Sequence, residues 1–130
     1  MHYKKDYLFG TTQELEIFNI IKDYFKTDLI RCATNCKYDY ADNVSSYEVK
    51  SRTNTLKYYP DTMITCNKIS NDKPLYFIFN FVDCITYIKY DEEKFKKYKT
   101  KMFSRARIST DEKLHVYIPI EDLTTIYKKV

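Results

Sequence analysis

The stretch YDYADNVSSYEVKSR, residues 38–52, decides the fold, because it predicts two short strands joined by a turn. Residues 42–46 are rich in the Asp, Asn and Ser that favour turns. Residues 47–52 alternate apolar and charged side chains, as a half-buried strand does. The alternation places Glu48 and Lys50 on one face of that strand, and Tyr47 and Val49 on the other. We therefore expect a β-hairpin with residues 38–41 as its first arm.

Elements of both kinds are predicted on either side of this hairpin. The spacing of apolar residues favours a helix over 11–25, and β-rich runs favour strands at 29–33, 75–79 and 85–90. A second helix is predicted over 60–69, from Pro60 and the capping residues Asp61 or Thr62. Residues 104–108 and 114–118 are expected to form a second hairpin, and 121–128 a closing helix. The expected class is α/β (α+β): one domain, 1–130, with a helix, a mixed central sheet of about four to five strands, a second helix and a small C-terminal hairpin and helix.

Composition excludes several classes of protein. The chain has 130 residues and a net charge of +4, from 22 Lys+Arg against 18 Asp+Glu. The single glycine, Gly10, excludes the glycine-rich loops of Rossmann and Walker phosphate-binding sites. No signal peptide or membrane span is visible, so we expect an intracellular protein, in the cytoplasm or nucleus of a host cell if it is viral, and not a secreted one. The four cysteines are interpreted as small buried thiols, Cys32 and Cys36 forming at most half a zinc site.

Carboxylates around the hairpin are candidate metal ligands. If Asp39 lies opposite Glu48 or Lys50, the carboxylates of Asp39 and Glu48 are close enough to share one divalent ion. Asp42 is the weaker alternative. Glu14 lies on the apolar stripe of the first helix, which suggests a third ligand, although Thr11 and Glu14 also have the spacing of a helix-capping box. The alternative for Glu48 and Lys50 is an ion pair on a solvated sheet face.

This order of parts resembles the PD-(D/E)XK nuclease superfamily, with its restriction-endonuclease-like fold, and is most similar to small viral or phage members. The resemblance spans roughly residues 11–90 and is carried by Glu14, by Asp39 in KYDY (37–40), and by YEVKSR (47–52). Residue 38 is Tyr where the family motif has Pro, which leaves the choice between Asp39 and Asp42 open.

The resemblance implies Glu14, Asp39, Glu48 and Lys50 as catalytic residues. Asp39, Glu48 and Glu14, with the Val49 carbonyl, would hold Mg²⁺ or Mn²⁺, which lowers the pKa of a bound water and neutralises phosphate charge. Lys50 would orient that water or stabilise developing negative charge.

Further basic residues are candidate contacts to nucleic acid. These are Arg52, Lys68, Lys97, Arg105 and Arg107. Lys68 is equally explained as a solvated helix residue. The run 94–102, if helical, puts Phe95, Tyr98 and Met102 on one stripe, with its lysines free to meet phosphates. The arginines at 105 and 107 share one strand face, which suits phosphate binding but also a solvated hairpin.

The first functional hypothesis is a metal-dependent nuclease that cleaves phosphodiester bonds of nucleic acid, with DNA, including branched or structured DNA, as the expected substrate. The alternatives are a non-catalytic nucleic-acid-binding or complex-subunit module on the same fold, and a metal-free interaction domain. The sequence leaves DNA against RNA and endonuclease against exonuclease open. A domain of this size needs a partner, such as a second copy in a homodimer, to cut both strands together.

Overall fold

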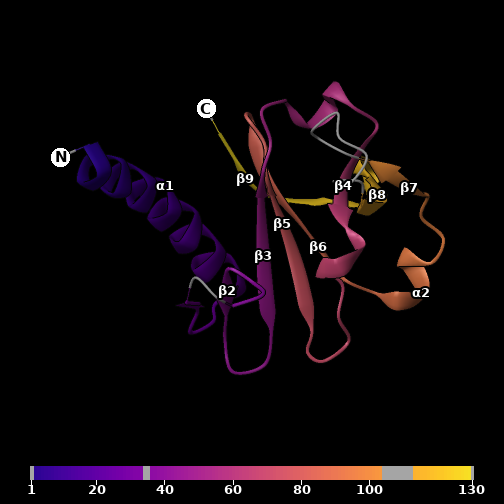
Figure 1. Cartoon of the computed structure of the whole chain (residues 1–130), viewed down its shortest axis with the longest axis horizontal. Helices are drawn as coiled ribbons and strands as arrows, with labels where there is room; N and C mark the ends of the chain where they lie inside the picture. The colour runs from indigo at the N-terminus through magenta and orange to yellow at the C-terminus, as the bar shows by residue number, and fades with distance from the viewer. Residues whose placement is uncertain (1, 34–35, 104–112, 130) are drawn as a thin grey trace.

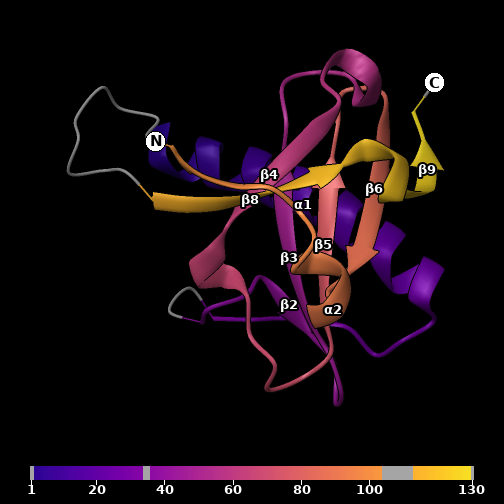
Figure 2. The same ribbon diagram turned by 90° about the vertical axis from the view of Figure 1, so that its right-hand side faces the viewer.

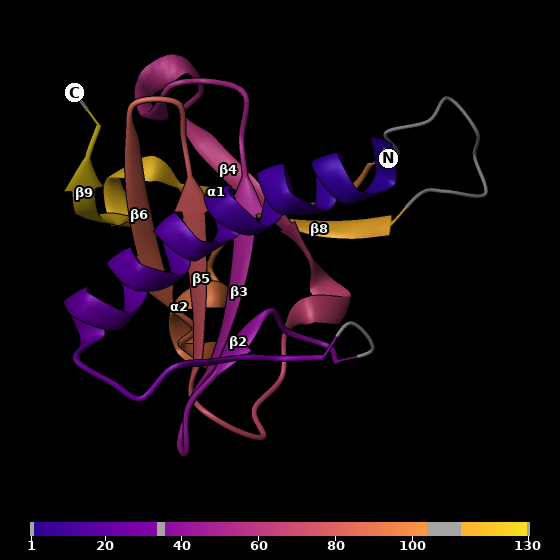
Figure 3. The same ribbon diagram turned by 90° about the vertical axis from the view of Figure 1, so that its left-hand side faces the viewer.

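The computed structural model, which describes residues 2–33, 36–103 and 113–129, is built in layers (Figure 1). Helix α1 (His2–Phe25) crosses one face of a six-stranded sheet (Figure 3). A three-stranded sheet and the short helix α2 (Glu92–Phe95) cover the opposite face (Figure 2). None of the described helices, α1 included, combines the length and the apolar character needed to cross a membrane.

The six-stranded sheet is mixed, and its strand order is β1-β2-β3-β5-β6-β9. Its strands are β1 (Ile30–Arg31), β2 (Tyr40–Ala41), β3 (Ser46–Ser51), β5 (Leu75–Asn80), β6 (Cys84–Lys89) and β9 (Thr124–Lys128). Neighbouring strands are antiparallel except β3 and β5, which pair in parallel. Parallel strands need a long crossover, and residues 52–74 supply it. The α+β class is therefore confirmed.

The smaller sheet has the order β4-β8-β7 and is antiparallel throughout. Its strands are β4 (Asp61–Thr65), β7 (Thr100–Phe103) and β8 (Lys113–Pro119). Three single-turn 3₁₀ segments complete the described elements: η1 (Leu56–Tyr58), η2 (Cys66–Lys68) and η4 (Ile120–Asp122). Strand β4 pairs with β8 and η2 follows β4 directly, so this part of the β3–β5 crossover lies over the same face of the large sheet as β8.

Alternation along the central strands sorts the core into two clusters, one on each face of the large sheet. On β5, Ile78 faces α1, whereas Phe77 and Phe79 face the small sheet. On β3, Tyr47 and Val49 join the α1 cluster. Glu48 and Lys50, which alternate with them, lie beside Phe77 and Phe79 in the register of the parallel pair. The Glu48–Lys50 face of β3 is therefore the face that the small sheet covers.

The hairpin and the central strands are confirmed, and the start of the first helix is corrected. Strands β2 and β3 pair antiparallel, with Tyr40 opposite Tyr47. The apolar stripe of α1, which includes Ile17, Phe18 and Ile21, packs on the sheet as predicted. However, α1 begins at His2, so positions 11 and 14 lie inside the helix and not at its N-terminus, where a capping box would need them.

The predicted helix over 60–69 is wrong, because residues 61–65 form strand β4 and residues 66–68 form η2. Thr62 and Ile64 are buried while their neighbours Asp61, Met63 and Thr65 are half-buried, which is the two-residue period of a strand. The β-branched side chains at 62, 64 and 65 favour this conformation, and pairing with β8 decides it.

The C-terminal predictions are also corrected. The closing helix over 121–128 is wrong, since β-branched Thr124, Thr125 and Ile126 begin strand β9 on the edge of the large sheet. Of the second hairpin, the arm expected at 114–118 is confirmed within β8, which pairs antiparallel with β7, whereas the arm expected at 104–108 lies outside the described part of the chain. Residues 94–102 are helical only to Phe95. Phe95 and Tyr98 pack in the core as predicted, whereas Met102 is exposed on β7. In the described part of the chain the central sheet has six strands, against the four to five expected, and the small sheet has three.

Candidate functional site

Glu48 is a buried carboxylate at the centre of the molecule. It lies in the middle of β3, next to Phe77 on β5, and only 3% of its surface is exposed. Residues of this kind are seldom buried without a partner, because an ionised carboxylate loses its hydration. The sequence pattern placed Glu48 and Lys50 on one face, and this face proves to lie between the two sheets and not in solvent. The expectation of an ion pair on a solvated sheet face is therefore wrong for Glu48.

Burial, one aspartate and two lysines shift the pKa of Glu48. Its Oε2 lies 3.3 Å from Lys50 Nζ and 3.4 Å from Lys68 Nζ. Burial and the nearby Asp39 carboxylate raise the pKa of Glu48, and the two ammonium groups oppose that rise without cancelling it. The other oxygen, Oε1, is buried and has no hydrogen-bond partner among the described residues. An orphaned buried acceptor costs stability unless a ligand satisfies it.

Lys68 reaches this site from the η2 turn, and not from the helix that the sequence pattern predicted. Its Nζ also donates a hydrogen bond to the Lys37 carbonyl at 2.7 Å, and its own carbonyl accepts one from the Tyr38 hydroxyl at 2.6 Å. These contacts tie the crossover to the segment that precedes Asp39. Lys68 is therefore held beside Glu48, and its role as a phosphate or active-site group stays a prediction.

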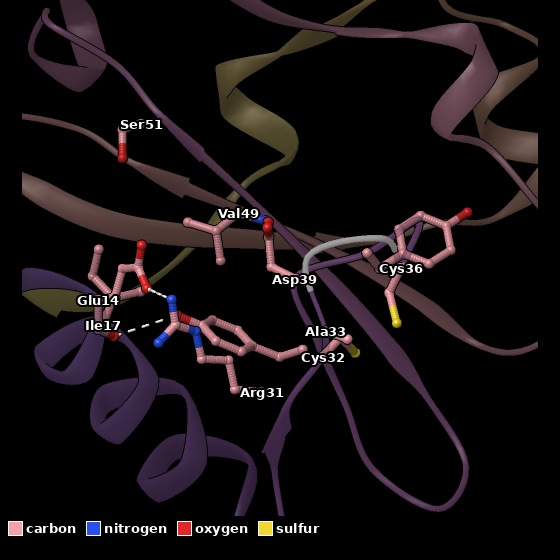
Figure 4. A pocket seen from close by; sticks show the side chains of 11 residues that line it. Glu14, Ile17, Arg31, Cys32, Ala33, Cys36, Asp39, Val49 and Ser51 are labelled. Atoms are coloured by element: carbon pink, nitrogen blue, oxygen red, sulfur yellow. Dashed lines mark hydrogen bonds and ion pairs between the residues drawn. The ribbon is translucent and has the colours of Figure 1, made fainter. Parts of the chain in front are cut away.

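Asp39 lies across from Glu48, at the edge of β3 where β2 has not yet begun. The β2–β3 register pairs Tyr40 with Tyr47, so Asp39 precedes that pair opposite Glu48. Its Oδ2 accepts a hydrogen bond from the Val49 N–H at 2.8 Å. Asp39 is exposed and lines a cavity of about 600 Å³ between α1 and this edge (Figure 4). Asp39 thus lies at the open cavity, and its charge is near enough to raise the pKa of Glu48.

Asp42 has a different task, because both of its oxygens accept hydrogen bonds within the hairpin turn. Oδ1 accepts from the N–H groups of Val44 and Ser45 at 2.8 and 2.6 Å. Oδ2 accepts from Thr27 Oγ1 at 2.7 Å and from the Tyr47 hydroxyl at 2.9 Å. Burial alone would raise the pKa of Asp42, but these hydrogen bonds outweigh it and lower the pKa. Asp42 is engaged in holding the turn.

Glu14 lies at the rim of the same cavity, where Figure 4 shows it pointing toward Arg31. The two side chains form an ion pair, and that of Glu14 is 49% exposed. The position of Glu14 on the helical stripe predicted a side chain that faces the core, and this prediction is wrong. Burial and the Glu14 carboxylate together raise the pKa of Tyr40, whose ring packs beneath α1, to about 12.

No three Asp, Glu, His or Cys side chains of the described segments converge closely enough to form a complete metal site. The set Asp39, Glu48 and Glu14 is therefore not brought together as three ligands. Two carboxylates remain, those of Asp39 and Glu48, and the Val49 carbonyl directly follows Glu48 in the chain. Such a pair of hard oxygen donors fits Mg²⁺, which keeps several waters and uses one or two carboxylates together with substrate phosphates.

The predicted nucleic-acid contacts are scattered. Arg52 donates hydrogen bonds to Thr62 Oγ1 at 3.0 Å and to the Met63 carbonyl, so it joins the two sheets. Lys97 is exposed in the turn after α2. Arg105 and Arg107 lie outside the described residues. A nucleic-acid role for these residues remains a prediction.

Two features of the site were missed from the sequence. Tyr38 and Lys37 anchor Lys68, although the aromatic residue before Asp39 was noted only as a departure from a motif. Cys32 and Cys36 line the cavity beside Asp39, and the expectation that they are buried is wrong, because Cys32 is half-buried and Cys36 is exposed. Partial burial and the neighbouring Cys36 raise the pKa of Cys32. The KYDY segment carried the only sequence signal for the first feature.

We compared the chain with protein-family models, curated proteins and solved structures, and none of them matches it.

Proposed function

We propose that this chain is a metal-dependent nuclease that hydrolyses phosphodiester bonds of nucleic acid, with DNA as the expected substrate, on a restriction-endonuclease-like core. One observation carries the proposal: Glu48 presents a buried carboxylate oxygen that no described residue satisfies, next to Asp39 and between two lysines. Titratable groups whose pKa is shifted by burial and by a specific charged neighbour are frequent at functional sites.

The order of the first elements supports the same proposal. Helix α1 precedes an antiparallel run of β1, β2 and β3, and β5 then adds in parallel to β3. A helix followed by a mixed sheet is what the resemblance to the PD-(D/E)XK superfamily implies. The second helix expected in the crossover is missing, and β4 with η2 occupies its place. The likeness of the core to the family therefore rests on the sheet and on α1.

In this proposal Asp39 and Glu48, with the Val49 carbonyl, hold Mg²⁺ or Mn²⁺. The bound ion supplies Lewis-acid chemistry, lowering the pKa of a water and neutralising charge on the phosphate. Lys50 stabilises negative charge on the phosphate or orients the attacking water, and its contact with Glu48 fixes its position. Lys68 adds a second positive charge at the same carboxylate. Glu14 is assigned to the cavity rim and not to the ion.

A second candidate function is a nucleic-acid-binding module without catalysis. The observation that favours it is the ion-pair network itself, because Glu48 already has two lysine partners and only two carboxylates meet at the site. A buried carboxylate that serves only to anchor Lys50 and Lys68 would need no metal.

Cleavage of supercoiled and branched DNA in Mg²⁺ or Mn²⁺ distinguishes the two candidates. We expect Glu48→Gln and Lys50→Met each to lower the rate at least about 100-fold. Glu93→Gln and Lys22→Met are matched controls, because both side chains are exposed, on α2 and α1, and neither belongs to the candidate site. The controls should cut at the wild-type rate. If the wild type cuts no substrate, or if Glu48→Gln cuts as well as wild type, the nuclease proposal is wrong.

A further inference from the structure

The outer face of the small sheet carries aromatic rings that no other layer covers within the described part of the chain. On β4 and β8 the buried residues Ile64 and Val116 pair across the strands and point to the core. Met63 and Tyr117 pair one position further along, and therefore lie on the opposite face. Phe103, on the adjacent strand β7, is 37% exposed. Figure 2 shows β4 and β8 on the outside of the molecule, in front of the large sheet.

A cavity of about 350 Å³ opens at this face, and three aromatic rings line it: Tyr59, Phe103 and Tyr117. The ring of Tyr59 is 54% exposed and meets that of Tyr58 edge-on, with centroids 4.7 Å apart. Large apolar surfaces left exposed together commonly mark interaction sites. Flat rings around an open cavity are suited to stacking against another flat group.

Positive charge surrounds these rings. Lys113 lies directly across from Phe103 in the β7–β8 register, and Lys101 lies across from His115. Lys57 precedes Tyr58 in η1, and Arg52 lines the cavity itself. All three of these lysines are exposed, whereas Asp61 is the acidic residue among those that line the cavity. Aromatic rings flanked by cations match a single-stranded nucleic acid, which offers flat bases and a chain of phosphates.

We propose that this face binds an unpaired segment of nucleic acid, with a base stacked in the cavity against Tyr59 and Phe103 and phosphates bound by Lys101 and Lys113. The choice of nucleic acid as the partner rests on the proposed function. Arg52 follows Glu48 by four residues on the chain that leaves β3, which corresponds to about 13 Å of extended strand. At about 3.4 Å per stacked nucleotide, roughly four nucleotides span the distance from the cavity to Glu48. The substrate class would then be branched or gapped nucleic acid with an unpaired arm.

Binding in the presence of EDTA tests this proposal without any cleavage. The probes are labelled oligothymidine and oligouridine of about twelve nucleotides and a duplex of the same length, followed by fluorescence anisotropy. We expect single strands to bind more tightly than the duplex. Tyr59→Ala and Phe103→Ala should each weaken binding about 5- to 150-fold, the range typical of one lost stacking contact. Tyr59→Phe, which keeps the ring, should bind within about twofold of wild type.

Tyr127→Ala is the matched control, because Tyr127 is 46% exposed but lies on β9 of the other sheet. Its binding should be unchanged. Preference for oligothymidine or for oligouridine identifies DNA or RNA, and either supports the proposal. The proposal is overturned if neither oligomer binds, if the duplex binds more tightly, or if Tyr59→Ala and Phe103→Ala bind like Tyr127→Ala. Dimerisation through this face without oligomer binding also overturns it. A chain that binds single strands but cuts nothing would refute the nuclease and leave this site intact.

Discussion

Replacing Asp42 by alanine should destabilise the fold far more than replacing Asp39, although the two aspartates stand three residues apart. Asp42 accepts four hydrogen bonds, from two backbone N–H groups and from the hydroxyls of Thr27 and Tyr47. Hydrogen bonds to a charged group contribute roughly 1.5–3 kcal/mol each when they are isolated. Because the turn is partly exposed and the four bonds share one carboxylate, we expect about 3–5 kcal/mol for Asp42→Ala. Among the described residues the Asp39 carboxylate accepts one hydrogen bond, from the Val49 N–H, so Asp39→Ala should cost about 1 kcal/mol.

The pH dependence of stability provides a second measure of the same difference. The pKa of Asp42 is lower in the folded chain, so the unfolded chain binds more protons between the two pKa values. The stability that Asp42 contributes is therefore complete above the unfolded pKa, near about 3.9, and is lost as pH falls through the folded pKa. Asp42→Asn should remove this acid-dependent loss.

Urea unfolding at several pH values, followed by circular dichroism, measures both effects.

Thermal melting with and without Mg²⁺ then separates the roles of Asp39 and Asp42. An ion at ten times its dissociation constant stabilises a protein by about 1.4 kcal/mol, which raises the melting temperature by roughly 3–8 °C for a chain of this size. We expect this rise in wild type and in Asp42→Asn, and its loss in Asp39→Ala. Equal destabilisation by Asp39→Ala and Asp42→Ala would refute the structural assignment of Asp42, and loss of the Mg²⁺ response in Asp42→Asn alone would move the metal to Asp42.

Two further substitutions test the other carboxylates. Burial raises the pKa of Glu48 above its ordinary 4.5, so the folded chain binds more protons than the unfolded chain between the two pKa values, and wild-type stability should fall as pH rises through them. Glu48→Gln should lack this fall and be the more stable protein at neutral pH. The same dependence of unfolding free energy on pH in both proteins would contradict the argument. Glu14→Ala removes an exposed ion pair with Arg31 and should cost under about 1 kcal/mol in urea unfolding while keeping the Mg²⁺ response; a lost response would return Glu14 to the metal site.

Local patterns predicted the central sheet well because its strands are decided by their own residues. The alternation of residues 47–52 and the apolar run from Leu75 gave β3 and β5 in the correct places. The helix predictions for residues 60–69 and 121–128 were wrong for a common reason. Pro60, and the acidic residues Glu121 and Asp122, are typical of a helix start. In both cases a distant partner strand, β8 or β6, decided the conformation. Such pairing between residues far apart in the chain leaves no trace in a short window.

The same contrast between local patterns and distant partners explains which residues of the candidate site could be predicted. Glu48, Lys50 and Asp39 belong to one hairpin, so their relation follows from its register. Lys68 joins them only because the crossover folds back over β3, and its role could be proposed but its element could not. For Glu14 the element was predicted correctly and the role was not. Its helical position is correct, but an arginine from β1 engages it at the cavity rim, and helical periodicity cannot anticipate that partner.

The position of Glu48 is the strongest argument that the site binds something. Its neighbours on β5 are the fully buried Phe77 and Phe79, so an apolar residue would suit this part of the core. Replacing a buried ionic group by a well-packed apolar one is often neutral or stabilising. The two lysines compensate the carboxylate only in part, since its pKa stays raised and Oε1 has no partner among the described residues. A carboxylate that weakens the fold and leaves one oxygen unsatisfied is explained if that oxygen meets a cation, and the Mg²⁺ melting experiment on wild type and Glu48→Gln measures that contact directly.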